Sequence, residues 1–207
     1  MKNLKKLIAI IMVIALMIPC TAMAATESPS KASLKSRNTT IALSKTSFTF
    51  NNKTQKPSVK KVTYKNAAGK KIDLKEGTDY KVTVSNTKNA GTYKVTITGM
   101  GKYSGSVKAS YTIKKASQKK NVKVTNKYKA TKAKTFKKKA KSYTFKATGV
   151  KEKAKVTYTT SSKKIKVKNG KIILSKGIKK GTYKVTIKVA KTKNYSAYSK
   201  TVTIKVK

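Results

Sequence analysis

One heptapeptide, Gly-Thr-Tyr-Lys-Val-Thr-Ile, occurs twice in this chain, at residues 91–97 and 181–187. In both copies Tyr, Val and Ile alternate with Lys and Thr, and a period of two is typical of a strand with one buried and one solvated face. Two further pairs of similar segments follow the copies: residues 102–104 with 194–196, and residues 111–114 with 202–205. The repeat therefore predicts two related β-modules.

Short apolar alternations bounded by turn residues continue on both sides of the heptapeptides. In residues 40–115 they predict about seven strands, with a bulge between Val59 and Val62. In the second half, Asn169-Gly170 separates two apolar pairs and predicts a two-residue hairpin. The lysine-rich segment 132–141 does not favour a helix, because like charges four residues apart repel. Turn signals every 8–12 residues are typical of β-sandwiches, so we expect an all-β chain.

The N-terminal residues predict a secretory signal peptide. Three lysines precede an apolar run over residues 7–19, and Ala22-Met23-Ala24 supplies a cleavage site. The run is shorter than the ~20 residues of a membrane span, so a membrane anchor is the weaker interpretation. The expected parts are these: signal peptide 1–24, flexible leader 25–39, first module 40–115, linker 116–120, and a lysine-rich second module 121–207. We expect a secreted protein without an integral span in its mature form.

The charge is strongly one-sided. The whole chain carries +47, with 52 basic and 5 acidic residues. Residues 25–115 carry +15, whereas residues 116–207 carry +29 with a single acid, Glu152. Only Arg37 is an arginine, and lysine is a hydrated point charge without the planar fork of arginine. This surface favours diffuse attraction to polyanions over base-specific recognition, although biased lysine usage in the genome is an alternative source of the lysines.

Catalytic side chains are scarce. The sequence has no His and no Trp, and its only cysteine, Cys20, lies in the expected signal peptide. This composition argues against His-dependent triads, thiol nucleophiles and the common zinc sites. Asp73, Glu76 and Asp79 lie close in sequence, but we expect a solvated turn there, with Asp79 paired to a lysine, rather than a calcium site. We therefore expect no enzyme, no small-molecule substrate, no metal and no cofactor.

Two minor alternatives concern covalent and aromatic chemistry. A Lys–Asn isopeptide crosslink needs a buried acid beside the pair, and Asp73 is the one acid at a possible inward position. Four tyrosines could stack on nucleic-acid bases, but core packing with the hydroxyl at the rim is the favoured interpretation: they are Tyr93, Tyr111, Tyr183 and Tyr195.

Several segments resemble the repeat modules of secreted and surface proteins of Firmicutes. In the first half these are residues 75–80, 89–99 and 101–105. The second half resembles bacterial Ig-like domains at residues 156–158, 165–172 and 181–187. The resemblance implies two tandem Ig-like β-sandwich modules after a cleaved signal peptide. It also implies a cell-surface role of the kind that stalk and adhesion units have.

The expected function is non-catalytic adhesion or polyanion binding through a lysine-rich surface. The candidate partners are an anionic cell-wall polymer such as teichoic acid, other anionic glycans including those of a host or matrix, and nucleic acid. The lysines expected to carry the contact are Lys137, Lys138, Lys139, Lys141, Lys163, Lys164, Lys179 and Lys180. A spacer without its own ligand is the main alternative, and a membrane-active cationic protein is a remote one. Retention at the wall would depend on charge.

Overall fold

The computed structural model describes residues 30–85 and 87–207, so the predicted signal peptide lies outside the described residues. Across these ranges the regular structure consists of β-strands and three short 3₁₀ helices, which confirms the all-β class. None of the described helices has the length and apolar character that crossing a membrane requires. Two separate buried cores lie within residues 31–207.

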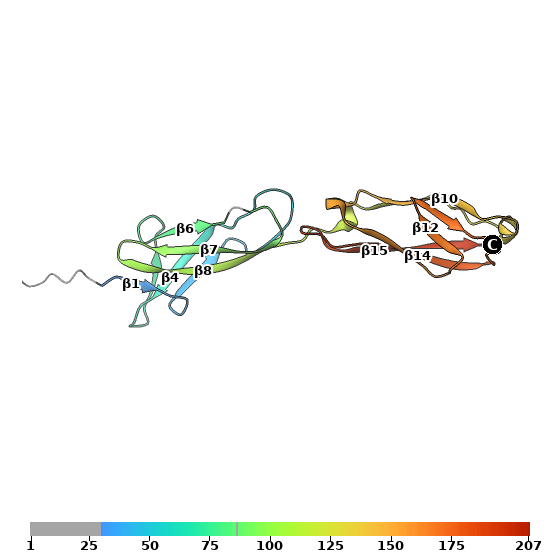
Figure 1. The fold of residues 1–207 in the computed structure, drawn as a ribbon. Helices are drawn as coiled ribbons and strands as arrows, with labels where there is room; N and C mark the ends of the chain where they lie inside the picture. Colours follow the sequence, from blue (N-terminus) through green and yellow to red (C-terminus); the bar gives the residue numbers. More distant parts are fainter. Residues whose placement is uncertain (1–29, 86) are drawn as a thin grey trace, which may run out of the picture. The chain divides into compact units, whose positions relative to one another are not determined.

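The first module is a sandwich of two sheets around one core (Figure 1). The five-stranded sheet has the order β1-β8-β7-β6, with β3 also paired to β8, and the three-stranded sheet has the order β2-β4-β5. The strands are β1 (Ala32–Leu34), β2 (Thr39–Leu43), β3 (Ser47–Thr49), β4 (Val59–Lys65), β5 (Lys71–Leu74), β6 (Tyr80–Val84), β7 (Gly91–Gly99) and β8 (Tyr103–Lys114). Val62 from one sheet and Val95 and Ile97 from the other are fully buried, which joins the two layers.

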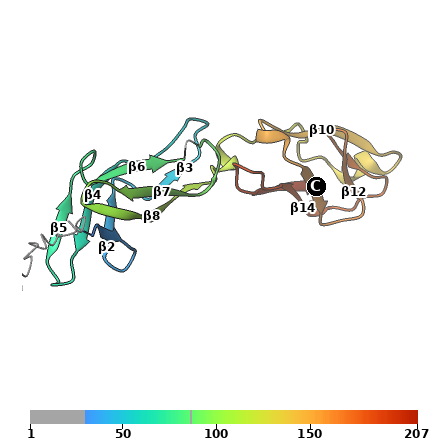
Figure 2. The same cartoon turned by 60° about the vertical axis from the view of Figure 1, so that its left-hand side comes forward.

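The second module is also a two-sheet sandwich (Figure 2). One sheet has the order β12-β13-β10-β9 and the other β11-β14-β15. The strands are β9 (Lys123–Asn126), β10 (Lys141–Thr148), β11 (Val156–Thr160), β12 (Ile165–Lys168), β13 (Lys171–Leu174), β14 (Gly181–Val189) and β15 (Tyr198–Val206). The 3₁₀ helices are η1 (Gln118–Lys120), η2 (Ala133–Phe136) and η3 (Lys151–Lys153). The heptapeptides thus begin β7 and β14, the central strands of their sheets.

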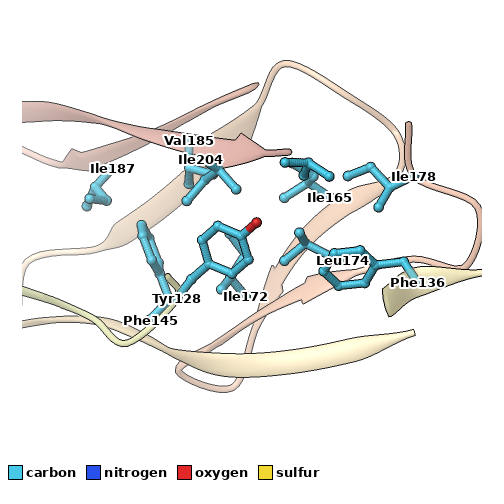
Figure 3. Close-up of a cluster of buried hydrophobic side chains, with 11 residues drawn as sticks. Tyr128, Phe136, Phe145, Ile165, Ile172, Leu174, Ile178, Val185, Ile187 and Ile204 are labelled. Carbon is cyan, nitrogen blue, oxygen red and sulfur yellow. The ribbon is translucent and has the colours of Figure 1, made fainter. Parts of the chain in front are cut away.

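Aliphatic and aromatic side chains from both sheets fill the second core (Figure 3). Phe136, Leu174 and Ile178 gather at one end of it, and Ile187 lies towards the other end. Phe136 and Leu174 are 0% exposed. Phe136 belongs to η2, so the lysine-rich segment contributes one anchoring ring to the core while its lysines stay outside.

Two local predictions are confirmed by the strand pairing. In the β2–β4 pair, Ala42 lies opposite Lys61 and Leu43 opposite Val59, so Lys60 is the extra residue of a bulge. The β12–β13 hairpin turns at Asn169 and Gly170, whose φ angles of 48° and 70° are the left-handed pair that a two-residue type I′ turn needs.

The predicted flexible leader, residues 25–39, is wrong for part of its length. Ala32–Leu34 form β1, which pairs in parallel with the start of β8. Leu34 is only 2% exposed and packs into the first core. A segment of three residues shows no period in the sequence, and the pairing partner lies about seventy positions away, so no local window could indicate it.

The predicted linker, residues 116–120, has regular structure of its own. Gln118 is fully buried and exchanges two hydrogen bonds with the backbone of Lys151, at 3.2 and 3.3 Å. The Ser117 side chain caps η1 by accepting from the Lys119 amide. Ala116 pairs in parallel with Tyr195, just as Ala32 pairs with Tyr103 at the entry to the first module. The two modules therefore share their entry geometry.

The strand register corrects one of the sequence matches between the halves. Tyr93 in β7 lies opposite Tyr111, and its counterpart Tyr183 in β14 lies opposite Ile204. Ile204 is therefore the structural counterpart of Tyr111, two positions beyond the Val202 that sequence similarity favours. The fully buried Tyr111 of the first core is replaced by a fully buried aliphatic side chain in the second.

Candidate functional site

The eight lysines predicted to bind polyanions are all exposed. Lys141 is the first residue of β10, and the other seven come from three connections of the second module: the approach to β10, the β11–β12 connection and the β13–β14 connection. These connections meet at the end of the sandwich where β14 begins and β15 ends, near the C label in Figure 1. Backbone hydrogen bonds hold them together there.

Three backbone contacts define this end of the module. The Gly177 amide donates to the Phe136 carbonyl at 3.0 Å, which joins the β13–β14 connection to η2. The Ser175 amide donates to the Lys164 carbonyl at 2.8 Å, which joins the β13–β14 connection to the β11–β12 connection. The Ala133 amide also donates to the carbonyl of Lys207, at the end of β15. Residues far apart in sequence thus become neighbours.

The same segments carry three more exposed lysines that sequence reasoning missed: Lys132, Lys134 and Lys176. Their signal was present in the composition, but only the fold shows that Lys176 lies beside Lys164, whose ammonium donates to the Lys176 carbonyl at 3.3 Å. We call the whole set the lysine pole: Lys132, Lys134, Lys137, Lys138, Lys139, Lys141, Lys163, Lys164, Lys176, Lys179 and Lys180.

The aromatic rings at the lysine pole are packed beneath it rather than presented to solvent. Phe136 is fully buried, and Tyr143 is half-buried against Tyr128 with ring centroids 5.1 Å apart. The Tyr183 hydroxyl donates to the carbonyl of Lys179 at 2.9 Å, so its ring supports the loop that carries two pole lysines. The structure thus supports the core-packing interpretation of this tyrosine.

The other three tyrosines singled out in the sequence also serve packing. Tyr93 and Tyr111 lie against each other in the first core with centroids 5.7 Å apart, and their hydroxyls donate to the Asn89 and Ser85 carbonyls. Tyr195 packs edge-on against Phe50, with centroids 5.5 Å apart.

Glu152, the single acid after Asp79, lies at the opposite end of the second module from the lysine pole. It belongs to η3, between β10 and β11, whereas the pole surrounds the start of β14. A nine-residue strand such as β14 spans about 30 Å. The second module is therefore electrically polarised, with its only acidic side chain about one strand length from its densest group of lysines.

The Glu152 carboxylate is held by hydrogen bonds. It accepts from the Asn194 amide side chain at 2.7 Å and from the Asn194 backbone at 3.1 Å. A hydrogen bond from the Thr192 side chain, and then those from Asn194, lower the pKa of Glu152 below its ordinary value. Asn194 is 5% exposed, and it also contacts the first module through Asn89 at 3.1 Å and the Ala90 amide at 2.7 Å.

Two of the three clustered acids of the first module, Asp73 and Asp79, have separate partners. Asp73 is 61% exposed and pairs with the Lys61 ammonium at 2.8 Å, and hydrogen bonds from Lys61 and Thr63 lower its pKa. Asp79 accepts from the Lys75 backbone amide at 2.8 Å, rather than from a lysine ammonium as expected. Because Asp73 is exposed, it does not supply the buried acid that an isopeptide crosslink needs. Within residues 30–85 and 87–207 no three His, Cys, Asp or Glu side chains lie close enough together to hold a metal ion.

Comparisons with known proteins concern only the fold. No family model and no curated protein matches the chain. Among solved structures, it is similar to the N-terminal Ig1-2 module of the Drosophila receptor protein tyrosine phosphatase DLAR, with 10% identity, a TM-score of 0.28 and coverage of 82% of this chain and 99% of that one. It is also similar to tandem Ig repeats of Dlar, with 12% identity, a TM-score of 0.29 and coverage of 82% of this chain and 98% of that one. A third similar structure contains the fibronectin(III)-like modules of Clostridium thermocellum CbhA, with 11% identity, a TM-score of 0.26 and coverage of 82% of this chain and 94% of that one.

These identities and TM-scores are low, so the assignment of the fold rests on the strand pairing and the two cores. The chain is an all-β protein with two sandwich modules in tandem.

Proposed function

We propose that this chain is a secreted or cell-surface, non-catalytic protein that binds an anionic polymer through the lysine pole. One observation carries the proposal: the fold brings eleven exposed lysines, from three connections and the first residue of β10, to one end of a module, and none of these connections contains an acid. Such a density of one charge raises the local concentration of polyanions and lowers the electrostatic free energy of binding.

The chemistry of the pole favours a phosphate- or carboxylate-bearing polymer without bases. Lysine ammonium groups neutralise anionic groups as point charges and select no planar, bidentate geometry. Binding of single-stranded nucleic acid gains much of its free energy from stacking on exposed aromatic rings, and the rings at the pole are packed inward. An anionic cell-wall polymer is therefore the partner that we favour, with wall association by charge.

The test is the salt dependence of binding to a defined polymer. The full chain is titrated with a poly(glycerol phosphate) at NaCl concentrations from about 50 to about 200 mM, where polyanion binding weakens steeply. Replacing Lys137, Lys138 and Lys139 with Ser should weaken binding about tenfold or more at the lower concentration. It should also reduce the slope of log K against log salt by about two, since each lost ion contact removes about 0.7–0.9.

A matched triple variant controls for the loss of net charge. Lys119, Lys120 and Lys123 are exposed at the Glu152 end of the second module, so replacing them with Ser removes the same charge away from the pole. We expect a much smaller effect. Equal losses in both variants would show that net charge alone attracts the polymer. No binding by the unaltered chain would favour a spacer without its own ligand.

A further inference from the structure

A solvent-open hollow of about 440 Å³ lies at the end of the β11-β14-β15 sheet farthest from the lysine pole. Three of its residues form one cross-strand row on the outer face: Thr157 in β11, Lys188 in β14 and Ser199 in β15. Lys155 lies beside this row, where its carbonyl accepts from the Ala190 amide at 2.9 Å. The volume is within the range of sites that hold small ligands.

The lining combines three kinds of chemistry. Ala190 and Ala197 sit at the two ends of the β14–β15 connection, and their small side chains leave the space open. Together with Tyr198 they supply a mainly apolar wall. Thr157 and Ser199 supply hydroxyl groups that donate and accept, and the exposed ammonium groups of Lys155 and Lys188 flank the wall.

The residues that line this hollow differ in charge from those of two other hollows, which lie in the first module. A hollow of about 610 Å³ includes Glu76 in its lining, and one of about 460 Å³ includes Asp73. A carboxylate in the wall opposes the binding of an anion. The hollow of the second module has two lysines and no acid in its lining, so it suits a negatively charged ligand better than these two.

We infer that this hollow binds a single anionic sugar unit, a pyranose that carries one carboxylate or phosphate. The C–H face of the ring would pack on Ala190, Ala197 and Tyr198, as sugars do on apolar and aromatic surfaces. The ring hydroxyls would exchange hydrogen bonds with Thr157 and Ser199, and the acidic group would lie between the two ammonium groups. The site is separate from the lysine pole and does not depend on polymer binding there.

Titration of the full chain, followed by backbone amide shifts in NMR spectra, tests the site. The probes are D-glucuronate and D-glucose 6-phosphate, which share the ring but differ in the acidic group. The neutral sugar D-glucose lacks the acidic group, and inorganic phosphate lacks the sugar ring. Saturable shifts at Lys188, Ala190, Ala197 and Ser199 with at least one sugar acid, and weaker shifts with glucose and phosphate, would support the inference. Inorganic phosphate that binds as tightly as the sugar acids would overturn it, as would the absence of saturable shifts.

Two variants and two controls locate the site. Lys188→Thr should weaken binding of the sugar acid about threefold to fivefold, the loss expected for one exposed ion pair, and Ala197→Tyr should abolish it by filling the hollow. Lys94→Thr makes the same change on β7 of the first module and should have no effect. The triple variant at Lys137, Lys138 and Lys139 should keep sugar-acid binding while it loses the polymer, which distinguishes failure of this inference from failure of the proposed function.

Discussion

Asn194 is a buried polar residue that joins several connections through hydrogen bonds. Its side chain and backbone take part in hydrogen bonds with Glu152, Asn89 and Ala90, so residues from two separate connections depend on it. Glu152 and its neighbour Lys153 adopt left-handed φ angles of 52° and 48° to bring the carboxylate into place. For residues other than glycine this conformation costs about 1–3 kcal/mol each, which the hydrogen bonds offset.

Acid should weaken this arrangement through Glu152. Its folded pKa lies below the ordinary 4.5, so the ionised carboxylate is the form that the fold stabilises. The contribution to the free energy of unfolding is complete above about pH 4.5 and is lost as the pH falls through the folded pKa. We expect Glu152→Gln to reduce the difference in thermal midpoint between about pH 7 and about pH 3.

Asp73 also has a lowered pKa, so the comparison is made in an Asp73→Asn background, where the pairing of Asp73 with Lys61 no longer titrates. An undiminished pH dependence after Glu152→Gln would show that the carboxylate adds nothing to stability.

Strands were predictable where several apolar residues alternate, because that pattern is local. β7 and β14 could be recognised from seven residues each, and the β12–β13 hairpin from its Asn-Gly pair. β1 could not, since its single large apolar residue, Leu34, is buried by a pairing with β8. The lysines of the candidate site were identifiable by composition, but their meeting at one end depends on which connections share that end.

The docking of β1 gives a prediction at the scale of the element. Leu34→Ala should lower the free energy of unfolding of the first module by about 2–4 kcal/mol, because the leucine is 2% exposed in the core. Urea unfolding of the full chain measures the change. Lys31→Ala, at an exposed position just before the strand, is the matched control and should change stability by less than about 0.5 kcal/mol. Equal values for the two variants would show that β1 does not contribute to the core.

Charge repulsion is the dominant electrostatic feature of the whole molecule. The chain carries +47, and Lys61–Asp73 is the one ion pair within 4.0 Å among the described residues. Compact packing brings like charges closer than they are in the unfolded chain, so the net charge destabilises the fold. Salt screens this repulsion over the Debye length, and the stability of the fold should therefore increase with ionic strength.

Thermal unfolding of the full chain from about 20 to about 500 mM NaCl should show a rising midpoint, since the Debye length falls below about 5 Å over this range. KCl at the same ionic strengths should give the same curve, because screening depends on ionic strength rather than on the cation. A midpoint that stays constant or falls would mean that the lysines are spaced widely enough to avoid one another.

The entry geometry of the modules has a mechanical consequence. In the first module β1 and β3 both run parallel to β8, the strand on which the chain leaves, and in the second module Ala116 and Thr131 form parallel bridges to Tyr195 and Val206. Tension applied at the two ends of such a module pulls the first and last strands past each other. Their hydrogen bonds are then loaded in shear, so several must break together rather than one after another, and each module resists stretching more than a hairpin opened from its end.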